Sequence, residues 1–330
     1  MKKRKLGNSG IEVAPLALGS NVFGWTVDER AAFAVLDAFV AAGGNLIDTA
    51  DSYSRWVAGN KGGESETIIG RWMKQSGKRD KVVIATKVGS EMGPKRKGLS
   101  KPYILSAIED SLRRLQTETI DLYQSHRDDA DTPQEETLDA YAQLIKQGKV
   151  RAIGASNFTA ERLSEALRIS EQRGYPAYQS LQPRYNLHDR AEYERSLEPL
   201  CREKGLGVIT YYSLASGFLS GKYRSEKDLS KSVRGPGVRI YMNDRGFRIL
   251  KSLDDVARQY GSSPAGVSLA WLMARPGITA PIVSATSVDQ LKDLIAATEI
   301  ELDEASIGLL DRASSMSVSS KEHAHRADFL

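Results

Sequence analysis

The sequence has almost no cysteine: Cys201 is the only one among its 330 residues. A single thiol excludes a disulfide bond within the chain, and the lack of a cysteine pair argues against a zinc or iron–sulfur site. Long apolar runs are also missing, since nowhere do about 18 consecutive apolar residues occur, the length that crosses a membrane. The basic start of the chain leads into no apolar segment of signal-peptide length, so we expect a cytoplasmic protein.

The chain has little net charge. Lys and Arg total 46 against 42 Asp and Glu, which leaves a formal charge of +4. This excess is too small to indicate nucleic acid or an anionic membrane as the main partner. The apolar share of 41% and the charged share of 27% are typical of a globular protein with a large core.

Eight short apolar runs, rich in β-branched residues, recur along the chain, and stretches with apolar residues three and four positions apart lie between them. The runs are 16–18, 45–47, 82–85, 120–123, 150–153, 177–181, 207–210 and 281–283. The first seven begin about 27 to 38 residues apart, the length of one strand–helix unit, and the last gap is roughly twice as long. This repetition predicts the α/β class, as a closed (β/α)8 TIM barrel.

A doubly wound sheet is the competing architecture, but its glycine fingerprint is absent. The nearest glycine cluster, at 59–63, follows no predicted strand directly and lacks the spacing of a phosphate-binding loop, so a connecting loop explains it better. We therefore expect one barrel domain over residues 1–330. A hairpin at 1–15 would close the bottom of the barrel, and a loop at 211–244 would extend over its mouth.

The last third of the chain predicts helices at 245–260, 264–274 and 303–316, followed by a tail at 318–330. His323 and His325 lie in this tail. No third ligand lies near them, so we predict no metal site there.

In such a barrel, chemistry takes place at the carboxyl ends of the strands. Asp48, Lys87 and His126 follow the second, third and fourth predicted strands, and Tyr53 lies in the loop after Asp48. A neighbouring ammonium lowers the pKa of a phenol, so we expect Lys87 to activate Tyr53 as an acid. Asp48 would keep the lysine charged. His126 would orient a carbonyl or assist proton transfer.

Such a site protonates a carbonyl oxygen, but no side chain supplies hydride, so a nicotinamide cofactor is implied. Ser156, Asn157 and Gln182, at the ends of the fifth and sixth strands, are suited to a carboxamide. Tyr211 after the seventh strand offers a ring that can stack on a flat heterocycle. The alternative for Ser156 and Asn157 is that they cap the helix expected from about residue 160.

Five motifs of the chain resemble those of the aldo-keto reductase superfamily. They are DTADSY at 48–53, ATK at 85–87, DLYQSH at 121–126, GASN at 154–157 and GFLSGKY at 217–223. The resemblance covers nearly the whole chain and is closest to the bacterial members related to potassium-channel β subunits. It implies a (β/α)8 barrel with a catalytic tetrad of Asp48, Tyr53, Lys87 and His126, in which Tyr53 donates the proton.

The resemblance also implies that NADPH lies across the mouth, with Ser156, Asn157 and Gln182 on its carboxamide and Tyr211 under the nicotinamide. The other implied cofactor contacts are Gly19, Ser20, Asn21, Asp48, Ser213, Leu214, Ser216, Gly217, Lys222 and Ser284. Many relatives carry a basic residue after the last strand, where this chain has Ser284-Ala285-Thr286-Ser287. We expect Thr286 and Gln290 to bind the adenosine end, and Lys222 with Arg234 to bind a phosphate. NADP is the predicted cofactor, with NAD as the alternative.

Phe23, Trp25 and Trp56 are expected to form aromatic walls of the substrate pocket, with Arg127 beside His126. Such walls favour a hydrophobic or ring-bearing aldehyde, ketone or alcohol. In the alternative interpretation, Trp25 and Trp56 only pack loops together. The sequence indicates neither the direction of the reaction nor the oligomeric state.

Two other functions compete with the oxidoreductase. The first is an NADPH-binding regulatory subunit with weak turnover, like the channel β subunits, although those tend to carry Asn where this chain has His126. The second is a Schiff-base aldolase with Lys87 as its nucleophile.

Overall fold

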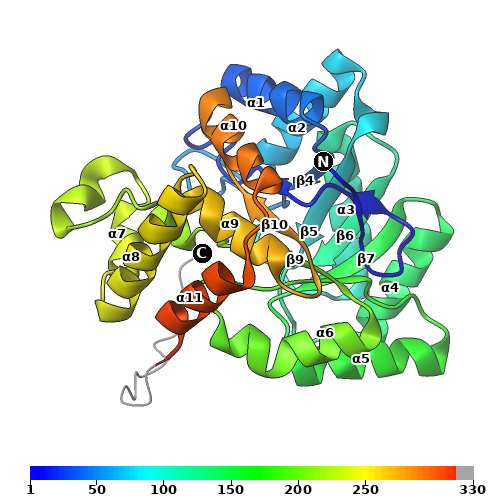
Figure 1. Ribbon diagram of the computed structural model, residues 1–330. Coiled ribbons are helices and arrows are strands. Elements are labelled where there is room, and N and C mark those ends of the chain that lie inside the picture. Colours follow the sequence, from blue (N-terminus) through cyan, green and yellow to red (C-terminus); the bar gives the residue numbers. More distant parts are fainter. Residues whose placement is uncertain (317–330) are drawn as a thin grey trace.

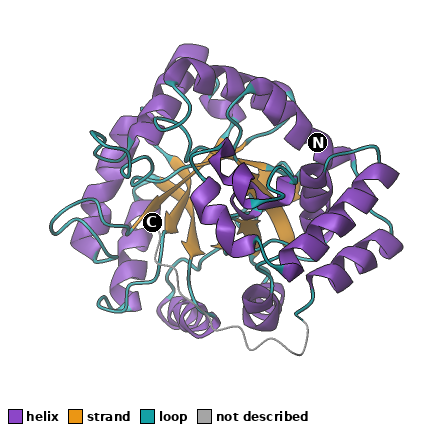
Figure 2. Ribbon diagram, turned by 90° about the vertical axis from the view of Figure 1, so that its left-hand side faces the viewer, coloured by secondary structure: helices purple, strands orange, loops and turns teal. Residues whose placement is uncertain are grey.

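The computed structural model of the protein describes residues 1–316. Eight parallel strands close into a barrel in the order β10-β3-β4-β5-β6-β7-β8-β9, and helices surround it (Figures 1 and 2). The strands are β3 (Ala17–Gly19), β4 (Leu46–Asp48), β5 (Val83–Val88), β6 (Ile120–Ser125), β7 (Val150–Ser156), β8 (Ser180–Gln182), β9 (Gly207–Thr210) and β10 (Ile278–Val283). The predicted TIM barrel is confirmed.

Helices follow the strands, as expected for repeated strand–helix units. The α-helices are α1 (Glu29–Ala41), α2 (Glu64–Ser76), α3 (Lys101–Leu115), α4 (Gln134–Lys146), α5 (Ala160–Arg173), α6 (Glu198–Lys204), α7 (Gly235–Val238), α8 (Asp244–Gln259), α9 (Pro264–Ala274), α10 (Val288–Ala296) and α11 (Glu304–Ser314). Asp28, Ser263 and Ser287 accept backbone N–H groups at the starts of α1, α9 and α10, which explains where these helices begin. The helices predicted from the last third of the sequence correspond to α8, α9 and α11.

The predicted strands differ from the observed ones mainly at their ends. β5, β6 and β7 continue past the apolar runs and include Lys87, Ser125 and Ser156. The ladder between strands is made by backbone groups, so a polar side chain does not end a strand. In contrast, 177–179 lie outside β8, which begins at Ser180.

The hairpin of β1 (Arg4–Lys5) and β2 (Glu12–Val13) closes the amino-terminal end of the barrel, as predicted. Leu6, Ile11 and Val13 pack against the inward-facing apolar residues of the strands. Asn45, just before β4, fixes the hairpin by donating to Glu12 O and accepting from Ala14 N. The bottom is therefore packed, and the mouth at the carboxyl ends of the strands is left for polar residues.

The segment predicted as a loop at 211–244 is a series of short helical turns. These are η3 (Ala215–Ser220), η4 (Glu226–Lys231), α7 and η5 (Arg239–Tyr241). After this segment, α8 packs against both α9 and α11 (Figure 1). Because α8 covers it on the outside, α9 has apolar residues on all sides and is almost entirely buried.

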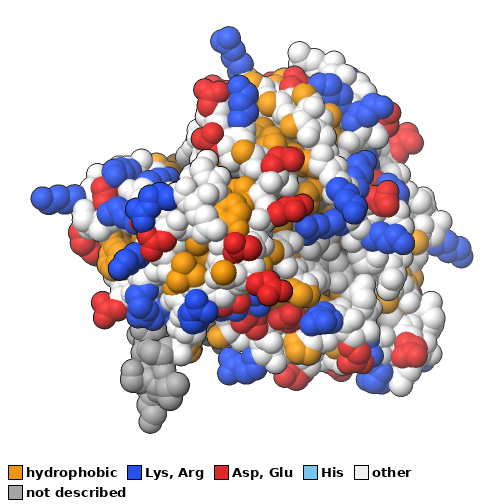
Figure 3. Space-filling view, in the orientation of Figure 1, with side chains coloured by type: hydrophobic (Ala, Val, Ile, Leu, Met, Phe, Trp, Pro, Cys, Tyr) orange, Lys and Arg blue, Asp and Glu red, His pale blue; other side chains and the backbone are white. Residues whose placement is uncertain are grey.

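Charged side chains of both signs are interspersed on the face in Figure 3. Within residues 1–316, no helix is long and apolar enough to span a membrane. The same part of the chain has no group of three or more His, Cys, Asp and Glu side chains arranged to hold a metal ion. His323, His325 and the predicted tail lie outside the described residues.

Candidate active site

The four predicted catalytic residues meet at the carboxyl ends of β4, β5 and β6. Lys87 Nζ donates to Asp48 Oδ2 at 2.7 Å and to Tyr53 Oη at 2.8 Å. Its third contact is with the backbone oxygen of Thr49 at 2.8 Å. The register of the parallel ladder places Asp48 opposite Ala85, two residues before Lys87. The strand order thus brings residues from three motifs into contact.

The ammonium of Lys87 is fully buried and ion-paired with Asp48. Burial lowers the pKa of Lys87, and the Asp48 carboxylate acts in the opposite direction. All three of its protons have acceptors within hydrogen-bond distance, and it also lies 4.6 Å from the centre of the Tyr53 ring. Lys87 is therefore held in a fixed position beneath the phenol.

Tyr53 differs from the prediction in its acidity. Burial and the Asp48 carboxylate, whose Oδ2 lies 3.3 Å from the phenol oxygen, raise the pKa of Tyr53 well above its usual range. The prediction that Lys87 lowers this pKa is wrong for the net effect, because burial and Asp48 outweigh the ammonium. Tyr53 is consequently a neutral phenol at neutral pH, the form that can donate a proton.

His126 follows β6, with its ring centre 6.0 Å from that of Tyr53. Burial, Lys87 and Arg127 hold the pKa of His126 well below its usual range. Its Nδ1 lies 3.0 Å from Ser90 Oγ. A neutral imidazole is suited to orienting a carbonyl by a hydrogen bond but not to supplying the transferred proton.

Gln182 contacts the catalytic cluster through Asp48. Its Nε2 donates to Asp48 Oδ1 at 2.8 Å and lies 3.4 Å from Gln124 Oε1. Gln124 was missed by the sequence analysis, although alternation along β6 places it on the inward face with Leu122. Gln124 Nε2 also lies 3.5 Å from Asp48 Oδ1, so both amides donate to this oxygen. Lys87 and Tyr53 donate to the other oxygen, Oδ2.

Ser156 and Asn157 do not cap α5, because Thr159 does so by accepting from Arg162 N. Ser156 Oγ instead donates to Gln182 O, and Asn157 Nδ2 donates to His126 O. Tyr211 Oη donates to Asn157 Oδ1 at 2.6 Å. This alternative from the sequence is therefore wrong, and the two side chains lie at the mouth beside His126 and Tyr211.

A turn with positive φ angles follows Tyr211 on the β9 side of the mouth. Ser216 and Gly217 have φ angles of 57° and 95°. A Cβ atom on Gly217 would lie 3.6 Å from Lys222 Nζ. Leu214 is half-buried beside this turn. A backbone turn with positive φ angles and an ammonium beside it is suited to binding a phosphate.

Arg234 reaches back from the segment 211–244 to the start of the barrel. Its Nη2 lies 3.4 Å from Asn21 Oδ1, which also accepts from Ser284 Oγ. Neither Lys222 nor Arg234 forms an ion pair with an acidic side chain in the part of the chain described. These uncompensated cations fit the phosphates of a dinucleotide. Nearby, exposed Gln290 accepts from both the backbone and the hydroxyl of Thr286.

Three residues predicted to contact the cofactor or the substrate have buried side chains, which excludes only Phe23 from its predicted role. Ser20 Oγ donates to Asp48 O, and Ser213 Oγ donates to Thr210 O. Phe23 is fully buried in the core instead of lining a pocket. The sequence shows that these residues follow strands but not which way their side chains point. Gly19, by contrast, ends β3 at the mouth.

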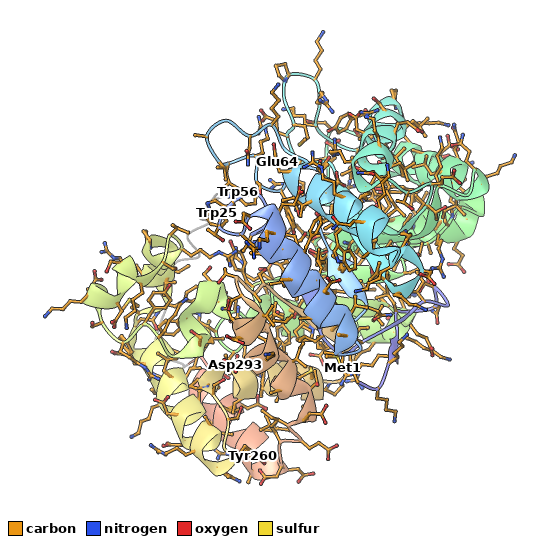
Figure 4. The ribbon with its side chains drawn as sticks, turned by 90° about the horizontal axis from the view of Figure 1, so that it is seen from above. Met1, Trp25, Trp56, Glu64, Tyr260 and Asp293 are labelled. Carbon is orange, nitrogen blue, oxygen red and sulfur yellow. The ribbon has the colours of Figure 1, made fainter. Side chains whose placement is uncertain are left out.

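Trp25 and Trp56 lie side by side near Glu64 at the start of α2 (Figure 4). Their ring centres are 5.6 Å apart, and that of Trp56 is 6.2 Å from Tyr53. Trp56 is 40% exposed. The two indoles thus extend from the phenol toward solvent, while Arg127 is exposed beside His126.

Comparison with known proteins identifies the family. Residues 15–315 match the profile of the Aldo/keto reductase family. The chain belongs to this family. It is 36% identical over 318 residues to "Uncharacterized oxidoreductase YrpG" of Bacillus subtilis (strain 168), covering 94% of this chain and 95% of that protein. It is 32% identical over 329 residues to "Protein tas" of Escherichia coli (strain K12), covering 92% and 95%.

A relative of a different description is also similar. The chain is 32% identical over 309 residues to "Probable voltage-gated potassium channel subunit beta" of Oryza sativa subsp. japonica, covering 91% of this chain and 92% of that protein. The predicted aldo-keto reductase resemblance is confirmed. Membership makes the chain an oxidoreductase of a family that generally uses NAD(P)H and acts on small carbonyl compounds.

In this aldo/keto reductase, a second buried ion pair supports the strand that carries Lys87. Glu66 accepts from Arg114 Nε at 2.6 Å and from Thr86 Oγ1 at 2.6 Å. Glu66 is fully buried on α2, and Thr86 lies next to Lys87. Glu66 thus holds β5 from the surrounding helix layer through Thr86, whereas Asp48 holds Lys87 at the mouth of the barrel.

Proposed function

We propose that the protein interconverts aldehydes or ketones with alcohols using NADPH, and that Tyr53 is the general acid and base. The contact of Lys87 Nζ with both Asp48 and Tyr53 Oη carries this proposal. It joins a neutral phenol to a fixed ammonium that stabilises the phenolate left after proton transfer. The Aldo/keto reductase profile and the relatives described as oxidoreductases support the same chemistry.

In the reduction, Tyr53 Oη gives its proton to the carbonyl oxygen and Lys87 stabilises the resulting phenolate. Asp48 keeps the ammonium in place, and His126 orients the carbonyl by a hydrogen bond. A bound reduced nicotinamide supplies the hydride that no side chain can provide. In the oxidation, the Tyr53 phenolate takes a proton from the alcohol. Since the pKa of Tyr53 is raised, we expect neutral pH to favour reduction.

We assign the nucleotide to the groups around the mouth. Ser156, Asn157 and Gln182 would hold the carboxamide, and Tyr211 would lie under the ring. The turn at Ser216 and Gly217, with Lys222, would hold the pyrophosphate. Arg234, Asn21 and Ser284 would face the rest of the dinucleotide, with Thr286 and Gln290 toward the adenosine. Uncompensated cations favour NADPH over NADH, because the 2′-phosphate adds negative charge.

The aromatic pair Trp25 and Trp56 would border the substrate. Their position beside Tyr53 favours a ring-bearing carbonyl compound. Arg127, exposed next to His126, would contact a polar substituent.

A regulatory NADPH-binding subunit is the second candidate, because the chain is similar to the described channel subunit of rice. His126 favours the enzyme, since an imidazole there can hydrogen-bond a carbonyl. A Schiff-base aldolase is disfavoured, because Lys87 is fully buried and its three protons are engaged. Borohydride with a carbonyl substrate should therefore leave the mass of Lys87 unchanged.

A panel of aldehydes, ketones and alcohols, followed by absorbance of the reduced nicotinamide with NADPH and NADH, tests the proposal. We expect aromatic aldehydes to be reduced at rates that saturate with substrate, and NADPH to be preferred. Tight NADPH binding without turnover of any panel member would instead support the regulatory subunit. No binding of either nucleotide would contradict both candidates.

A further inference from the structure

We propose that Ser90 is a positioning residue that fixes the tautomer of His126. Its hydroxyl donates to Nδ1, so the ring proton lies on Nε2 and the imidazole offers the substrate a hydrogen-bond donor instead of a base. This inference rests on the proposed carbonyl chemistry, although the tautomer itself is a property of the protein alone.

Ser90 and His126 are joined by a direct contact between neighbouring strand ends. Ser90 Oγ lies 3.0 Å from His126 Nδ1, and Ser90 is only 9% exposed. The backbone of His126 is held as well, because its N–H donates to Val88 O and its carbonyl accepts from Asn157 Nδ2. With the backbone fixed on both sides, the Ser90 contact determines the orientation of the ring.

The backbone after β5 brings Ser90 into this position. Gly89 has a φ angle of 116°, a conformation that other residues rarely adopt, and its carbonyl accepts from Gly98 N. A Cβ atom at Gly89 would lie 3.0 Å from Leu99 Cδ2. The turn therefore requires glycine, and it directs residue 90 toward β6.

The available hydrogen-bond partners indicate that Ser90 donates to His126 and not the reverse. Nδ1 of His126 is the only partner of the Ser90 hydroxyl among residues 1–316. If Nδ1 carried the proton, the hydroxyl proton of a nearly buried serine would have no acceptor in the described chain, which is unfavourable. If the hydroxyl donates, both groups are satisfied and the proton lies on Nε2. Nε2 makes no hydrogen bond with the described residues, so it is left for a substrate.

The charges around His126 agree with a neutral ring. Lys87 from β5 and Arg127 from the loop after β6 are the cations that act on it, and both disfavour the imidazolium. The phenol of Tyr53 faces it, and the Asp48 carboxylate is engaged by Lys87, Tyr53 and Gln182. A carboxylate at position 90 would accept from Nδ1–H and make the ring more basic. Serine orients the ring without this effect.

The test compares Ser90→Ala, Ser90→Thr and Ser90→Asp with a matched control, Ser170→Ala. Ser170 lies on α5, is also buried (2% exposed), and its hydroxyl donates to Pro176 O instead of to a residue of the site. We expect Ser90→Ala to lower kcat for an aromatic aldehyde by about tenfold, the loss typical of one hydrogen bond. The affinity for NADPH should not change. Ser90→Thr should restore most of the rate, and Ser90→Asp should introduce an inflection of the rate between pH 5 and 8. The control should behave as the wild type.

Nitrogen NMR of ¹⁵N-histidine-labelled protein reads the tautomer without any turnover, with His126→Asn identifying the signal. We expect the Nε2–H form in the wild type and a mixture of tautomers in Ser90→Ala. An Nδ1–H ring in the wild type would overturn the inference, as would Ser90→Ala with unchanged kcat and an unchanged spectrum. The wild-type spectrum decides even if a variant fails to fold. Failure of the panel of carbonyl compounds would count against the proposed function but not against the tautomer.

Discussion

The two sides of the barrel mouth are built by different means. On the strand side, formed by the ends of β4, β5 and β6, Asp48 and Lys87 are buried and fixed by register and an ion pair. On the loop side, formed by residues 211–244, Lys222 and Arg234 extend from short helical turns and form no ion pair in the described chain. On the strand side, the charges of the protein balance one another. On the loop side, we propose that a bound anion balances the charges of Lys222 and Arg234.

The largest effect should come from breaking the strand side at Lys87. Lys87→Met removes the ammonium that stabilises the Tyr53 phenolate, so we expect kcat to fall by about 10² to 10⁴. The change also leaves Asp48 without its cation, so the variant should have a lower Tm. Rates should be measured where circular dichroism shows a folded protein, with Lys149→Met as a surface control. An unchanged rate–pH profile would show that the ammonium does not assist the phenol.

A smaller loss is expected at His126. His126→Asn keeps an amide that can donate a hydrogen bond, so kcat should fall by about 10-fold to 100-fold. In the wild type, the lowered pKa of His126 keeps the ring neutral, so the rate should show no inflection near pH 6.5. A nearly inactive variant would indicate that His126 does more than orient the carbonyl.

Substitutions on the loop side should change the KM for the nucleotide rather than kcat. Arg234→Met and Lys222→Met should each raise the KM for NADPH by about tenfold, the effect of one charge-assisted contact with phosphate. The KM for NADH should change less in Arg234→Met, whereas Lys222→Met should raise the KM for both nucleotides, because both carry the pyrophosphate. In each variant kcat should be nearly unchanged. Arg168→Met, which changes an exposed residue of α5, is the control. Equal catalytic efficiency of the wild type with both nucleotides would remove any role of these residues in selecting the phosphate.

The same comparison explains what the sequence could predict. Asp48, Lys87 and His126 were found because they end apolar runs, and the ends of parallel strands meet at one edge. Ser20, Ser213 and Phe23 follow strands in the same way, but their side chains point into the protein, and a linear pattern gives no direction outside a regular strand. The prediction of a lowered pKa for Tyr53 was wrong for a related reason. This pKa depends on how deeply the phenol is buried and on its distance from Asp48. The spacing of residues along the sequence gives neither quantity.

Ser90 was missed because it lies three residues beyond Lys87, after a glycine turn. Gln124 was accessible from the alternation along β6, since it shares a face with Leu122 and with the site. The turn at Ser216 and Gly217, which we propose holds the nucleotide, was assigned through the motif at 217–223. The resemblance, rather than periodicity, supplied that assignment, because short helical turns have no repeating pattern.

The proposed reduction depends most directly on the proton of Tyr53, and Tyr53→Phe removes that hydroxyl and little else. The measurement is kcat for aldehyde reduction, together with the Kd of NADPH from fluorescence titration. We predict a fall in kcat of at least about 10² with an unchanged Kd, because the phenol that donates the proton is lost while the groups proposed to hold the nucleotide remain. A variant that retains its turnover, or that loses NADPH binding in step with turnover, would contradict the assignment of Tyr53 as the proton donor.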